Sequence, residues 1–298
     1  MTNSSTLLPK LYVASSSASS CEYHRIVLPY MNIGELDLKV PILWFNRSFQ
    51  HGIEKVESAK NRGAKIIMDL DDLFRLGQDH YLYDSWKQFG VTEQIIQHLK
   101  LADVVTVTTD ILANMVVEVN KNVVIVPNAL PFDQDQFTMN ERFDDTRLIY
   151  VAGTSHQKDF ELMDFNSGLT VAGLHIDNLP TKEVMPAVRY MSLYDGHQAA
   201  LAPLVDTEFN RCKSNLKLLE AGAKGLPLFA SKIPPYLNSN DASIIQYVEY
   251  GKSWKAMTQR YSNEHLADIG AMTAQHVRKH YHLKDANAVR RQIFESFS

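Results

Sequence analysis

The sequence predicts an α/β protein made of two Rossmann-like βαβ domains that face each other across a cleft. Short apolar runs alternate with amphipathic stretches along the chain, as in repeated βα units around parallel sheets. The series is interrupted once, by Pro127, Pro131 and the polar stretch 132–146, which indicates a linker between domains. The length of 298 residues also exceeds the ~100–200 residues usual for one domain.

The first domain is predicted over residues 1–135. Its strands are runs of Val, Ile and Leu without strict alternation, as expected where helices cover both faces of a sheet. They are expected at 10–15, 40–45, 65–70, 103–108 and 122–126. Helices are expected at 21–33, 51–62, 92–101 and 110–119. Thr109 or Asp110 can cap the last of these helices.

The second domain is predicted over residues 146–280, and a C-terminal helix over 281–298 is expected to pack back on the first domain. Strands are expected at 148–152, 169–173, 199–204 and 226–230. Helices are expected at 158–166, 182–191 and 212–224, and the chain is expected to be helical from 251 onward. Ligands of such sheets bind beyond the carboxyl ends of the strands, so the polar residues just after each strand are the candidate site residues.

Composition narrows the class of protein. With 45% apolar and 21% charged residues the chain is typical of a soluble folded protein, and a net charge of -4 argues against nucleic-acid binding by bulk charge alone. The N-terminus has no signal-peptide pattern, and no apolar run reaches the ~20 residues that span a bilayer. Two distant cysteines, Cys21 and Cys212, suit a reducing compartment. We expect a cytoplasmic protein, in the host cytoplasm if a phage encodes it.

The most informative segment runs from Phe209 to Gly225. A loop precedes a predicted helix whose first turn contains Lys213, Ser214, Asn215 and Lys217. A helix start presents unpaired N–H groups and partial positive charge, so it can hold a diphosphate, while Glu220 can accept hydrogen bonds from ribose hydroxyls. By spacing alone, an ordinary solvated loop and helix explains the segment equally well.

The string Ser214-Asn-Leu-Lys217-Leu-Leu-Glu220-Ala-Gly-Ala-Lys-Gly225-Leu-Pro227 resembles the donor-site signature of retaining GT-B glycosyltransferases, the family typified by glycogen and sucrose synthases (glycosyltransferase family four-like). The resemblance implies a GT-B fold, a nucleotide-sugar donor such as a UDP-sugar, and no required metal or other cofactor. It implies that Glu220 holds the ribose and that Lys217 and the backbone of Ser214, Asn215 and Leu216 lie near the diphosphate. The family has an earlier glutamate, separated by seven residues from the second, where this chain has Cys212. The sugar, and whether the missing glutamate impairs catalysis, stay open.

A second segment with this resemblance is Ile149-Tyr-Val-Ala-Gly153-Thr154-Ser-His156-Gln-Lys158-Asp159. The family opens its second domain with a strand, a glycine-containing turn and a basic residue followed by an acid. Gly153 lets the backbone approach phosphate closely, and Lys158 helps to balance the leaving-group charge. The expected donor-binding residues are Gly153, Thr154, Lys158, Asn210, Lys213, Ser214, Asn215, Leu216, Lys217 and Glu220. A third likeness, Pro127-Asn128-Ala129 after a strand, implies a structural role at the domain junction.

Three carboxylates, Asp69, Asp71 and Asp72, end a predicted central strand. They can share Mg²⁺ or Mn²⁺, they can orient or deprotonate an acceptor hydroxyl, or they can serve as caps and loop anchors. Because GT-B enzymes generally need no metal, the resemblance favours Asp71 or Asp72 as acceptor-side catalytic residues beside Lys158 and Lys217. Polar residues after the neighbouring strands complete the expected acceptor side: Ser16, Tyr23, His24, Arg25, Asn46, Arg47 and Asp69.

The C-terminal stretch is the most basic part of the chain. Arg278, Lys279, Lys284, Arg290 and Arg291 either contact an anionic acceptor or return to the first domain. His276 and His280, with His282 nearby, have a spacing that permits metal binding, although a solvated helix face explains them better.

The predicted function is sugar transfer from a nucleoside diphosphate sugar to an acceptor hydroxyl with retention of configuration. A hydroxymethylated base of phage DNA, reached with the help of the basic tail, is one acceptor, and duplex DNA is then the partner. A protein, lipid-linked or polysaccharide acceptor is the alternative. A non-catalytic nucleotide-sugar-binding module, an epimerase and a phosphorylase also stay open, as does the oligomeric state.

Overall fold

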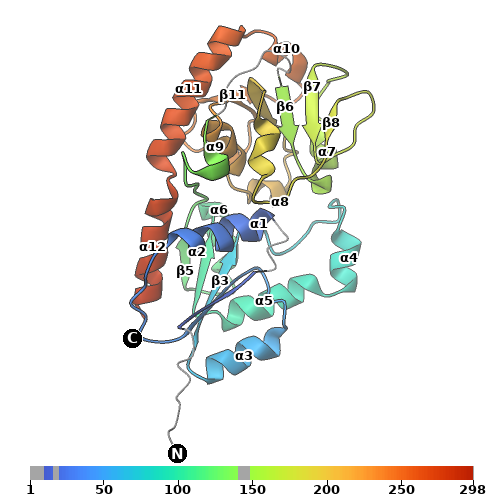
Figure 1. Ribbon diagram of the computed structural model, residues 1–298. Helices are drawn as coiled ribbons and strands as arrows, with labels where there is room; N and C mark the ends of the chain where they lie inside the picture. The colour runs from blue at the N-terminus through green and yellow to red at the C-terminus, as the bar shows by residue number, and fades with distance from the viewer. Residues whose placement is uncertain (1–9, 16–19, 140–147, 298) are drawn as a thin grey trace, which may run out of the picture. The chain divides into compact units, whose positions relative to one another are not determined.

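The computed structural model describes residues 10–15, 20–139 and 148–297, which form two compact units (Figure 1). The first unit comprises the chain up to Pro127 together with the segment from Lys284 to the C-terminus, and the second comprises Asn128–Leu283. The chain therefore enters the second unit once and returns to the first. Ser16, predicted for the acceptor side, lies outside the described residues.

The first unit is built on a parallel sheet in the order β1-β2-β3-β4-β5. All five strands fall within predicted runs or extend one residue beyond them: β1 (Leu11–Ala14), β2 (Ile42–Asn46), β3 (Lys65–Leu70), β4 (Val104–Val107) and β5 (Val123–Ile125). Asn46 pairs in register with Asp69, so the polar ends of β2 and β3 meet at one edge of the sheet.

Helices cover both faces of this sheet. The predicted helix 21–33 is one helical stretch made of α1 (Ser20–Glu22), the π-helical η1 (Tyr23–Val27) and α2 (Leu28–Asn32). The others are α3 (Ile53–Asn61), α4 (Tyr83–Gln88), α5 (Val91–Leu101), α6 (Asp110–Val116) and the C-terminal α12 (Leu283–Glu295). Consecutive strand residues point to opposite faces, and Trp44 meets Phe294 of α12 while Phe45 meets His98 of α5. The predicted cap of α6 is confirmed, since the Thr109 hydroxyl accepts from the Leu112 N–H.

The second unit contains a parallel sheet in the order β11-β10-β9-β6-β7-β8. Its strands are β6 (Leu148–Val151), β7 (Leu169–Ala172), β8 (Thr181–Lys182), β9 (Ala199–Ala202), β10 (Leu228–Ser231) and β11 (Ile245–Val248). From β6 the chain runs outward through β7 and β8, then returns to β9 and continues the other way. The strand order thus reverses between β6 and β9, which is where doubly wound sheets open a crevice for ligands.

The helical segments of the second unit are short until its end. They are α7 (Gln157–Phe160), α8 (Glu208–Arg211), α9 (Leu216–Ala223), α10 (Trp254–Thr258) and α11 (Asn263–His280), with 3-10 turns η2 (Asp135–Phe137), η3 (Thr154–His156), η4 (Tyr190–Tyr194) and η5 (Pro234–Tyr236). The predicted helical C-terminal segment agrees with α10, α11 and α12. In the described part of the chain, every helix is too short or too polar to cross a membrane.

One helix prediction in this unit is wrong, and two others have wrong bounds. The stretch 182–191 holds the end of β8 and the start of η4, and Pro186 lies within it, where a proline removes a helical N–H. The helix expected over 158–166 ends at Phe160. The helix expected over 212–224 begins at Leu216, so Lys213 and Ser214 lie in the loop before it and Asn215 is its N-cap. Strands β8 and β11 and helix α4 escaped prediction because they are short and partly polar.

Two glycines that flank β7 test how closely the chain after β7 approaches the end of β6. Gly168 and Gly173 both have positive φ, +75° and +86°. A Cβ on Gly173 would lie 2.1 Å from the Ala152 carbonyl oxygen, whereas one on Gly168 would meet nothing within 4 Å. Gly168→Ala should therefore cost only the ~1 kcal/mol of backbone strain, and Gly173→Ala should cost at least about 2 kcal/mol more. Urea unfolding measures both, and equal losses would contradict the close approach.

Candidate functional site

The loops after β6 and β9 are held together by one buried carboxylate, that of Asp159. Its Oδ1 accepts hydrogen bonds from the Val205 N–H (2.7 Å) and from the Asn210 side-chain amide (3.1 Å), and its Oδ2 lies 2.7 Å from Nδ1 of His156. Asp159 is 4% exposed. Because β6 and β9 flank the strand-order reversal, this carboxylate fixes the two loops that border the switch point of the sheet.

Positive charge gathers beside these loops. Burial lowers the pKa of His156, the hydrogen bond to Asp159 opposes this, and the charges of Lys213 and Lys217 lower it further. These two lysines are therefore close enough to act on the imidazole. Lys213 is half-buried with its ammonium 4.7 Å from the ring centroid of Phe209, and Lys158 is exposed at the start of α7. The arrangement can hold an anion.

The start of α9 is anchored by polar contacts to distant parts of the unit. The Asn128 amide donates to the Ser214 hydroxyl (2.7 Å), and the Asn215 amide donates to Oδ2 of Asp241 (2.9 Å). Asp241 is fully buried and also accepts from the Tyr281 hydroxyl, while its Oδ1 lies 2.8 Å from Nε2 of His276. The loop that carries Lys213, Ser214 and Asn215 thus has a fixed path.

Glu220 lies one turn into α9 and is 1% exposed. The Tyr190 hydroxyl donates to its Oε1 (2.6 Å), and the Tyr194 hydroxyl (2.6 Å) and the Lys217 ammonium (2.7 Å) donate to its Oε2. Burial raises the pKa of Tyr194, and the Glu220 charge adds to the effect. The carboxylate predicted to hold a ribose therefore sits in a closed group of three donors.

Cys212, which stands where the resembling family has its first glutamate, ends α8 and is 0% exposed. Its side chain is packed inside the unit. A side chain without exposed surface does not contact a bound sugar unless the loop moves.

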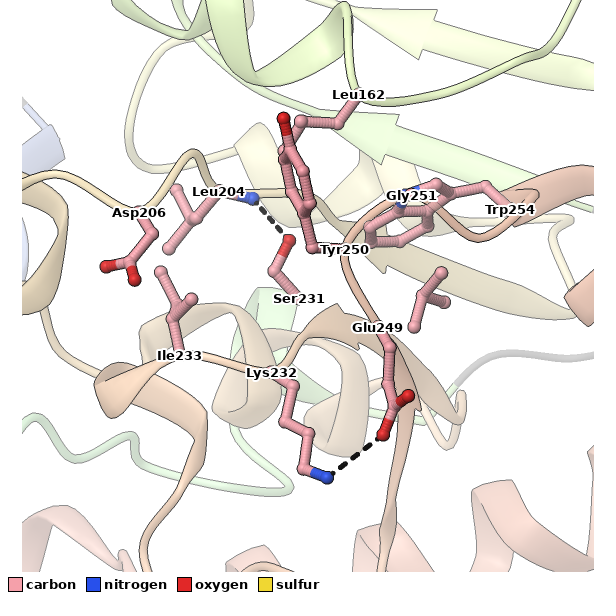
Figure 2. Close-up of a pocket in the computed structure, with 11 residues that line it drawn as sticks. Leu162, Leu204, Asp206, Ser231, Lys232, Ile233, Glu249, Tyr250, Gly251 and Trp254 are labelled. Atoms are coloured by element: carbon pink, nitrogen blue, oxygen red, sulfur yellow. Dashed lines mark hydrogen bonds and ion pairs between the residues drawn. The ribbon is translucent and has the colours of Figure 1, made fainter.

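A separate hollow lies near the carboxyl ends of β9, β10 and β11 (Figure 2). Its volume is about 170 Å³, smaller than the ~300–1,000 Å³ of typical ligand pockets. Apolar side chains, including Leu204, Ile233 and Trp254, line it, and the Lys232–Glu249 ion pair (3.1 Å) lies beside it. None of the residues predicted to bind the donor lines this hollow.

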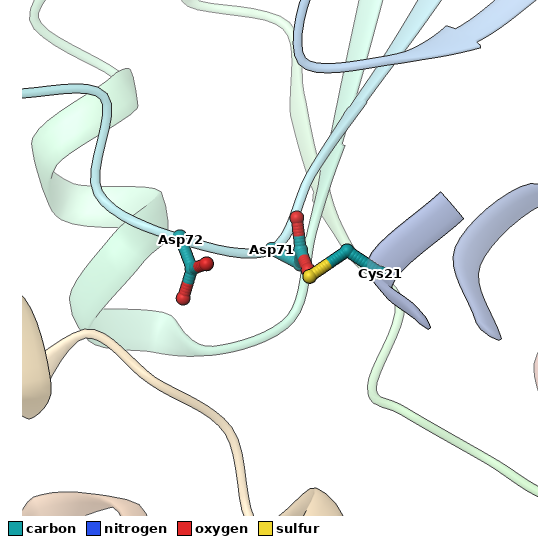
Figure 3. Close-up of side chains that lie close together, drawn as sticks. All are labelled: Cys21, Asp71 and Asp72. Carbon is teal, nitrogen blue, oxygen red and sulfur yellow. The ribbon is translucent and has the colours of Figure 1, made fainter. Parts of the chain in front are cut away.

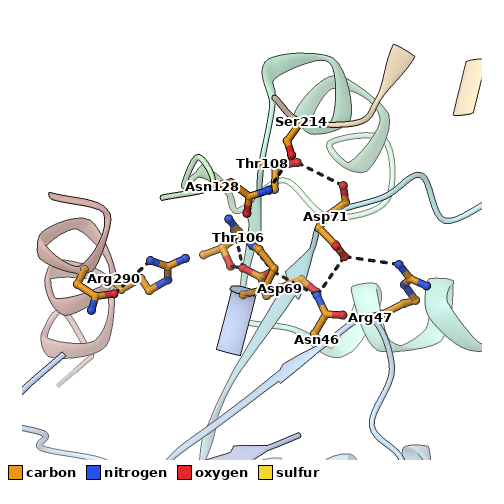
Figure 4. A network of polar contacts seen from close by, with 11 residues as sticks. Asn46, Arg47, Asp69, Asp71, Thr106, Thr108, Asn128, Ser214 and Arg290 are labelled. Carbon is orange, nitrogen blue, oxygen red and sulfur yellow. Dashed lines mark hydrogen bonds and ion pairs between the residues drawn. The ribbon is translucent and has the colours of Figure 1, made fainter. Parts of the chain in front are cut away.

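In the first unit, Asp69 is the centre of a buried polar network (Figure 4). The Arg25 guanidinium donates two hydrogen bonds to it, both of 2.8 Å, and these side chains are 1% and 0% exposed. The Thr106 hydroxyl (2.6 Å) and the Asn46 amide (3.3 Å) also donate to the carboxylate. Burial opposes the charge of Arg25, but the pair with Asp69 outweighs it and raises the pKa of the guanidinium.

A second arginine, Arg290 of α12, lies near this network and is 2% exposed. Burial and then the charge of Arg25 lower its pKa to about 9, which leaves it charged at neutral pH. It donates to Asn287 (3.2 Å). Of the predicted acceptor-side residues, Arg25 and Asp69 are thus paired inside the unit, and Tyr23 and His24 are buried beside each other with ring centroids 5.4 Å apart.

Asp71, Asp72 and Cys21 form a smaller cluster whose ligand atoms lie within 4.8 Å of one another (Figure 3). The Arg47 guanidinium lies 3.1 Å from Asp72 and 3.5 Å from Asp71, and it supplies the positive charge that such a cluster needs. Burial and the two aspartates raise the pKa of the Cys21 thiol, which disfavours the thiolate that binds metals. Arg47 holds a left-handed backbone conformation with φ of 61°, a strained state for a non-glycine residue.

The three arginines of the basic C-terminal stretch make contacts within their own units. Arg278 pairs with Asp133 (2.7 Å), and Arg291 pairs with Glu295 (3.1 Å) and donates to the carbonyl oxygen of Ile33 (2.7 Å). Arg290 is buried, whereas Lys279 and Lys284 are exposed. His276 and His280 stack with ring centroids 4.6 Å apart, and His276 faces Asp241.

Sequence reasoning assigned no role to four residues that organise the donor region: His156, Tyr190, Tyr194 and Asp241. A His-x-x-Asp pattern directly after a strand was a usable signal for His156 and Asp159. The tyrosines and Asp241 are distant in sequence from the segments they contact, so spacing gave no sign of them.

Comparisons with known proteins bear on the fold. No protein-family model matches the chain, and no curated protein matches it. Among solved structures, TarM superposes with a TM-score of 0.61 at 11% identity, covering 90% of this chain and 57% of TarM. A sucrose-phosphate synthase from Thermosynechococcus elongatus gives 0.58 at 12% identity, covering 86% and 73% of the two chains. Trehalose-6-phosphate synthase OtsA gives 0.57 at 9% identity, covering 91% and 74%.

At these identities the likeness shows the fold alone. The chain has the GT-B fold of these glycosyltransferases, as predicted. It spans little more than half the length of TarM.

Substitutions of Asp69 and Asp72 test whether Asp69 mainly stabilises the first unit, in contrast to the more exposed Asp72. Asp69→Ala leaves Arg25 buried without its partner, so the free energy of unfolding should fall by about 3–5 kcal/mol. The matched variant Asp72→Ala opens a partly exposed pair with Arg47 and should cost about 1 kcal/mol or less. Chemical denaturation measures both. Similar losses in the two variants would show that the Asp69 pair is not the main anchor.

Proposed function

We propose that the chain is a glycosyltransferase that moves a sugar from a nucleoside diphosphate sugar to an acceptor hydroxyl with retention of configuration. The observation that carries the proposal is the group of cations at the switch point of the second unit, Lys213 and Lys217 beside His156, next to the start of α9. The GT-B fold supports it, since TarM superposes over 90% of the chain.

The chemistry of transfer explains why cations are needed there. The bond between the anomeric carbon and the β-phosphate oxygen breaks, a bond to the acceptor oxygen forms, and the acceptor hydroxyl loses its proton. Negative charge therefore grows on the departing diphosphate. Preorganised donors aimed at that charge lower the barrier without reorganising during the reaction. Lys213, Lys217 and the exposed Lys158 are the donors we assign to it.

Lys217 and Glu220 act together in this proposal. Before donor binding, the Lys217 ammonium lies 2.7 Å from Oε2 of Glu220. A bound diphosphate competes for Lys217, whose 29% exposed side chain covers Glu220. When the ammonium turns to the phosphate it uncovers Oε2, which can then accept a hydrogen bond from a ribose hydroxyl. Tyr190 and Tyr194 keep the carboxylate in place while this exchange occurs.

On the acceptor side we assign Asp71 and Asp72 to the orientation of the attacking hydroxyl, with Arg47 holding both carboxylates. The engagement of Arg278, Arg290 and Arg291 within the chain leaves Lys279 and Lys284 as the exposed residues among these five cations. This favours a protein, lipid-linked or polysaccharide acceptor over a hydroxymethylated base of duplex DNA.

The donor proposal predicts that Lys217→Met weakens binding of UDP, GDP or ADP, whichever binds most tightly, by about 10- to 100-fold, because it removes a charge-assisted contact. Binding of the matching nucleoside, which lacks phosphate, should not weaken, because the variant has no Lys217–Glu220 pair for the ribose to open. Lys252→Met, at an exposed lysine, is the control. Calorimetric titration measures all three proteins, and equal loss of nucleoside and nucleotide binding would contradict the phosphate role.

Activity is tested with a panel of UDP-, GDP- and ADP-sugars and acceptors of each class. We expect turnover with one donor and, for a sugar-retaining enzyme, a product of unchanged anomeric configuration by NMR. An enzyme acting on duplex DNA should bind it with an affinity that falls steeply with salt. Donor binding without turnover on any acceptor supports a non-catalytic module, turnover without acceptor an epimerase, and dependence on inorganic phosphate a phosphorylase.

A further inference from the structure

The hydrogen bond between His156 and Asp159 fixes both the tautomer and the orientation of the imidazole ring. A carboxylate only accepts hydrogen bonds, so Nδ1 of His156 carries the proton that meets Oδ2 of Asp159 at 2.7 Å. Asp159 itself cannot rotate freely, because Val205 and Asn210 hold its other oxygen. The ring orientation is therefore fixed, and Nε2 is the nitrogen left to meet a ligand.

The surroundings of this ring contain more cations than anions. Asp159 of α7 faces Nδ1, and the ammonium groups of Lys213 and Lys217 act on the ring from the loop before α9 and from α9 itself. Tyr150 of β6 donates its hydroxyl to the His156 carbonyl oxygen (3.4 Å), and burial raises the pKa of that hydroxyl, which stays neutral. One carboxylate, Asp159, and two lysines therefore act on the ring, and one of the lysines, Lys217, is also paired with Glu220.

We propose that His156 contacts the diphosphate of the donor through Nε2 and takes up a proton from solvent when the donor binds. This inference rests on the proposed function, since it assigns a further residue to the same donor site. The neutral ring presents a lone pair at Nε2, which repels a phosphate oxygen, whereas the imidazolium presents an N–H that donates to it. Binding therefore couples the arrival of the anion to protonation of the ring.

The direction of the pH dependence follows from two pKa values of His156. In the protein without donor, burial and the lysines keep the pKa of the ring below its usual value of 6.5. A bound diphosphate brings negative charge to Nε2 and raises it. Donor affinity should thus increase as pH falls through the pKa of the complex and level off below the pKa of the protein without donor.

Sugar nucleotides are the suitable probe because both phosphates of UDP-glucose, GDP-mannose or ADP-glucose keep one charge each from pH 6 to 9. With the tightest binder of the three, calorimetry at pH 7.5 in HEPES and in Tris buffer, which differ in ionisation enthalpy and contain no phosphate, gives the number of protons taken up. We expect about half to one proton for the wild-type protein, and an affinity about tenfold higher at pH 6.5 than at pH 8.5.

The variant His156→Gln keeps a hydrogen-bonding side chain but cannot titrate. It should take up almost no proton, and its affinity should change less than twofold between these pH values. His175→Gln is the matched control, because His175 is an exposed histidine beside Asp177 in the same unit, 82% exposed, and should behave as the wild type. The wild-type measurement needs no variant, so the inference is tested even if His156→Gln folds poorly.

The outcomes separate the two proposals. Donor binding with no proton uptake in the wild-type protein, or with the same uptake in His156→Gln, overturns the role of His156 and leaves the glycosyltransferase proposal standing. Absence of binding by all three sugar nucleotides overturns the proposed function and this inference with it. Proton uptake that His156→Gln abolishes supports both.

Discussion

The Asp159 carboxylate connects three parts of the second unit that are separated in sequence: the turn after β6, the backbone after β9 at Val205, and Asn210 of α8. A buried carboxylate is costly unless it accepts enough hydrogen bonds, and here three donors meet it. Because those donors come from both sides of the strand reversal, satisfying Asp159 fixes the loops on which the candidate donor residues stand. The position of His156 and the approach to Lys213 follow from that constraint.

The same principle recurs wherever an acid is buried in this protein. Asp69 is met by Arg25, Thr106 and Asn46, Glu220 by two tyrosines and Lys217, and Asp241 by Asn215 and Tyr281, with His276 facing its other oxygen. Fully buried pairs such as Arg25–Asp69 have no surface left for a ligand, so their role is to hold the sheet ends together. Pairs with an exposed cation are different, because a 29% exposed Lys217 can exchange one anion for another.

The sheets were predictable because buried parallel strands leave a strong signal, as at Lys65–Leu70, where the predicted and observed ends coincide. Short helices carry no such signal: the stretch 182–191 looked amphipathic, yet Pro186 and the packing of Tyr190 and Tyr194 against Glu220 decide its conformation. Lys213, Lys217 and Glu220 could be predicted together because they lie in one short segment of the sequence. Sequence spacing could not predict that Asp159 or Asp241 would tie that segment to others, because those contacts depend on tertiary packing.

In the proposed function, charge balance also decides how tightly a donor binds. In the protein without donor, Lys217 already has an anionic partner in Glu220 at 2.7 Å, so a diphosphate gains only the difference between two pairings. That loss is offset if the vacated Oε2 accepts a ribose hydroxyl and if His156 gains a proton, since each adds a hydrogen bond that exists only in the complex. A ligand with phosphate but no ribose would take Lys217 and leave Oε2 of Glu220 without a replacement donor. A ligand with ribose but no phosphate would displace Lys217 from Glu220 and give the ammonium no new partner. The proposed function therefore predicts selectivity for a whole nucleoside diphosphate.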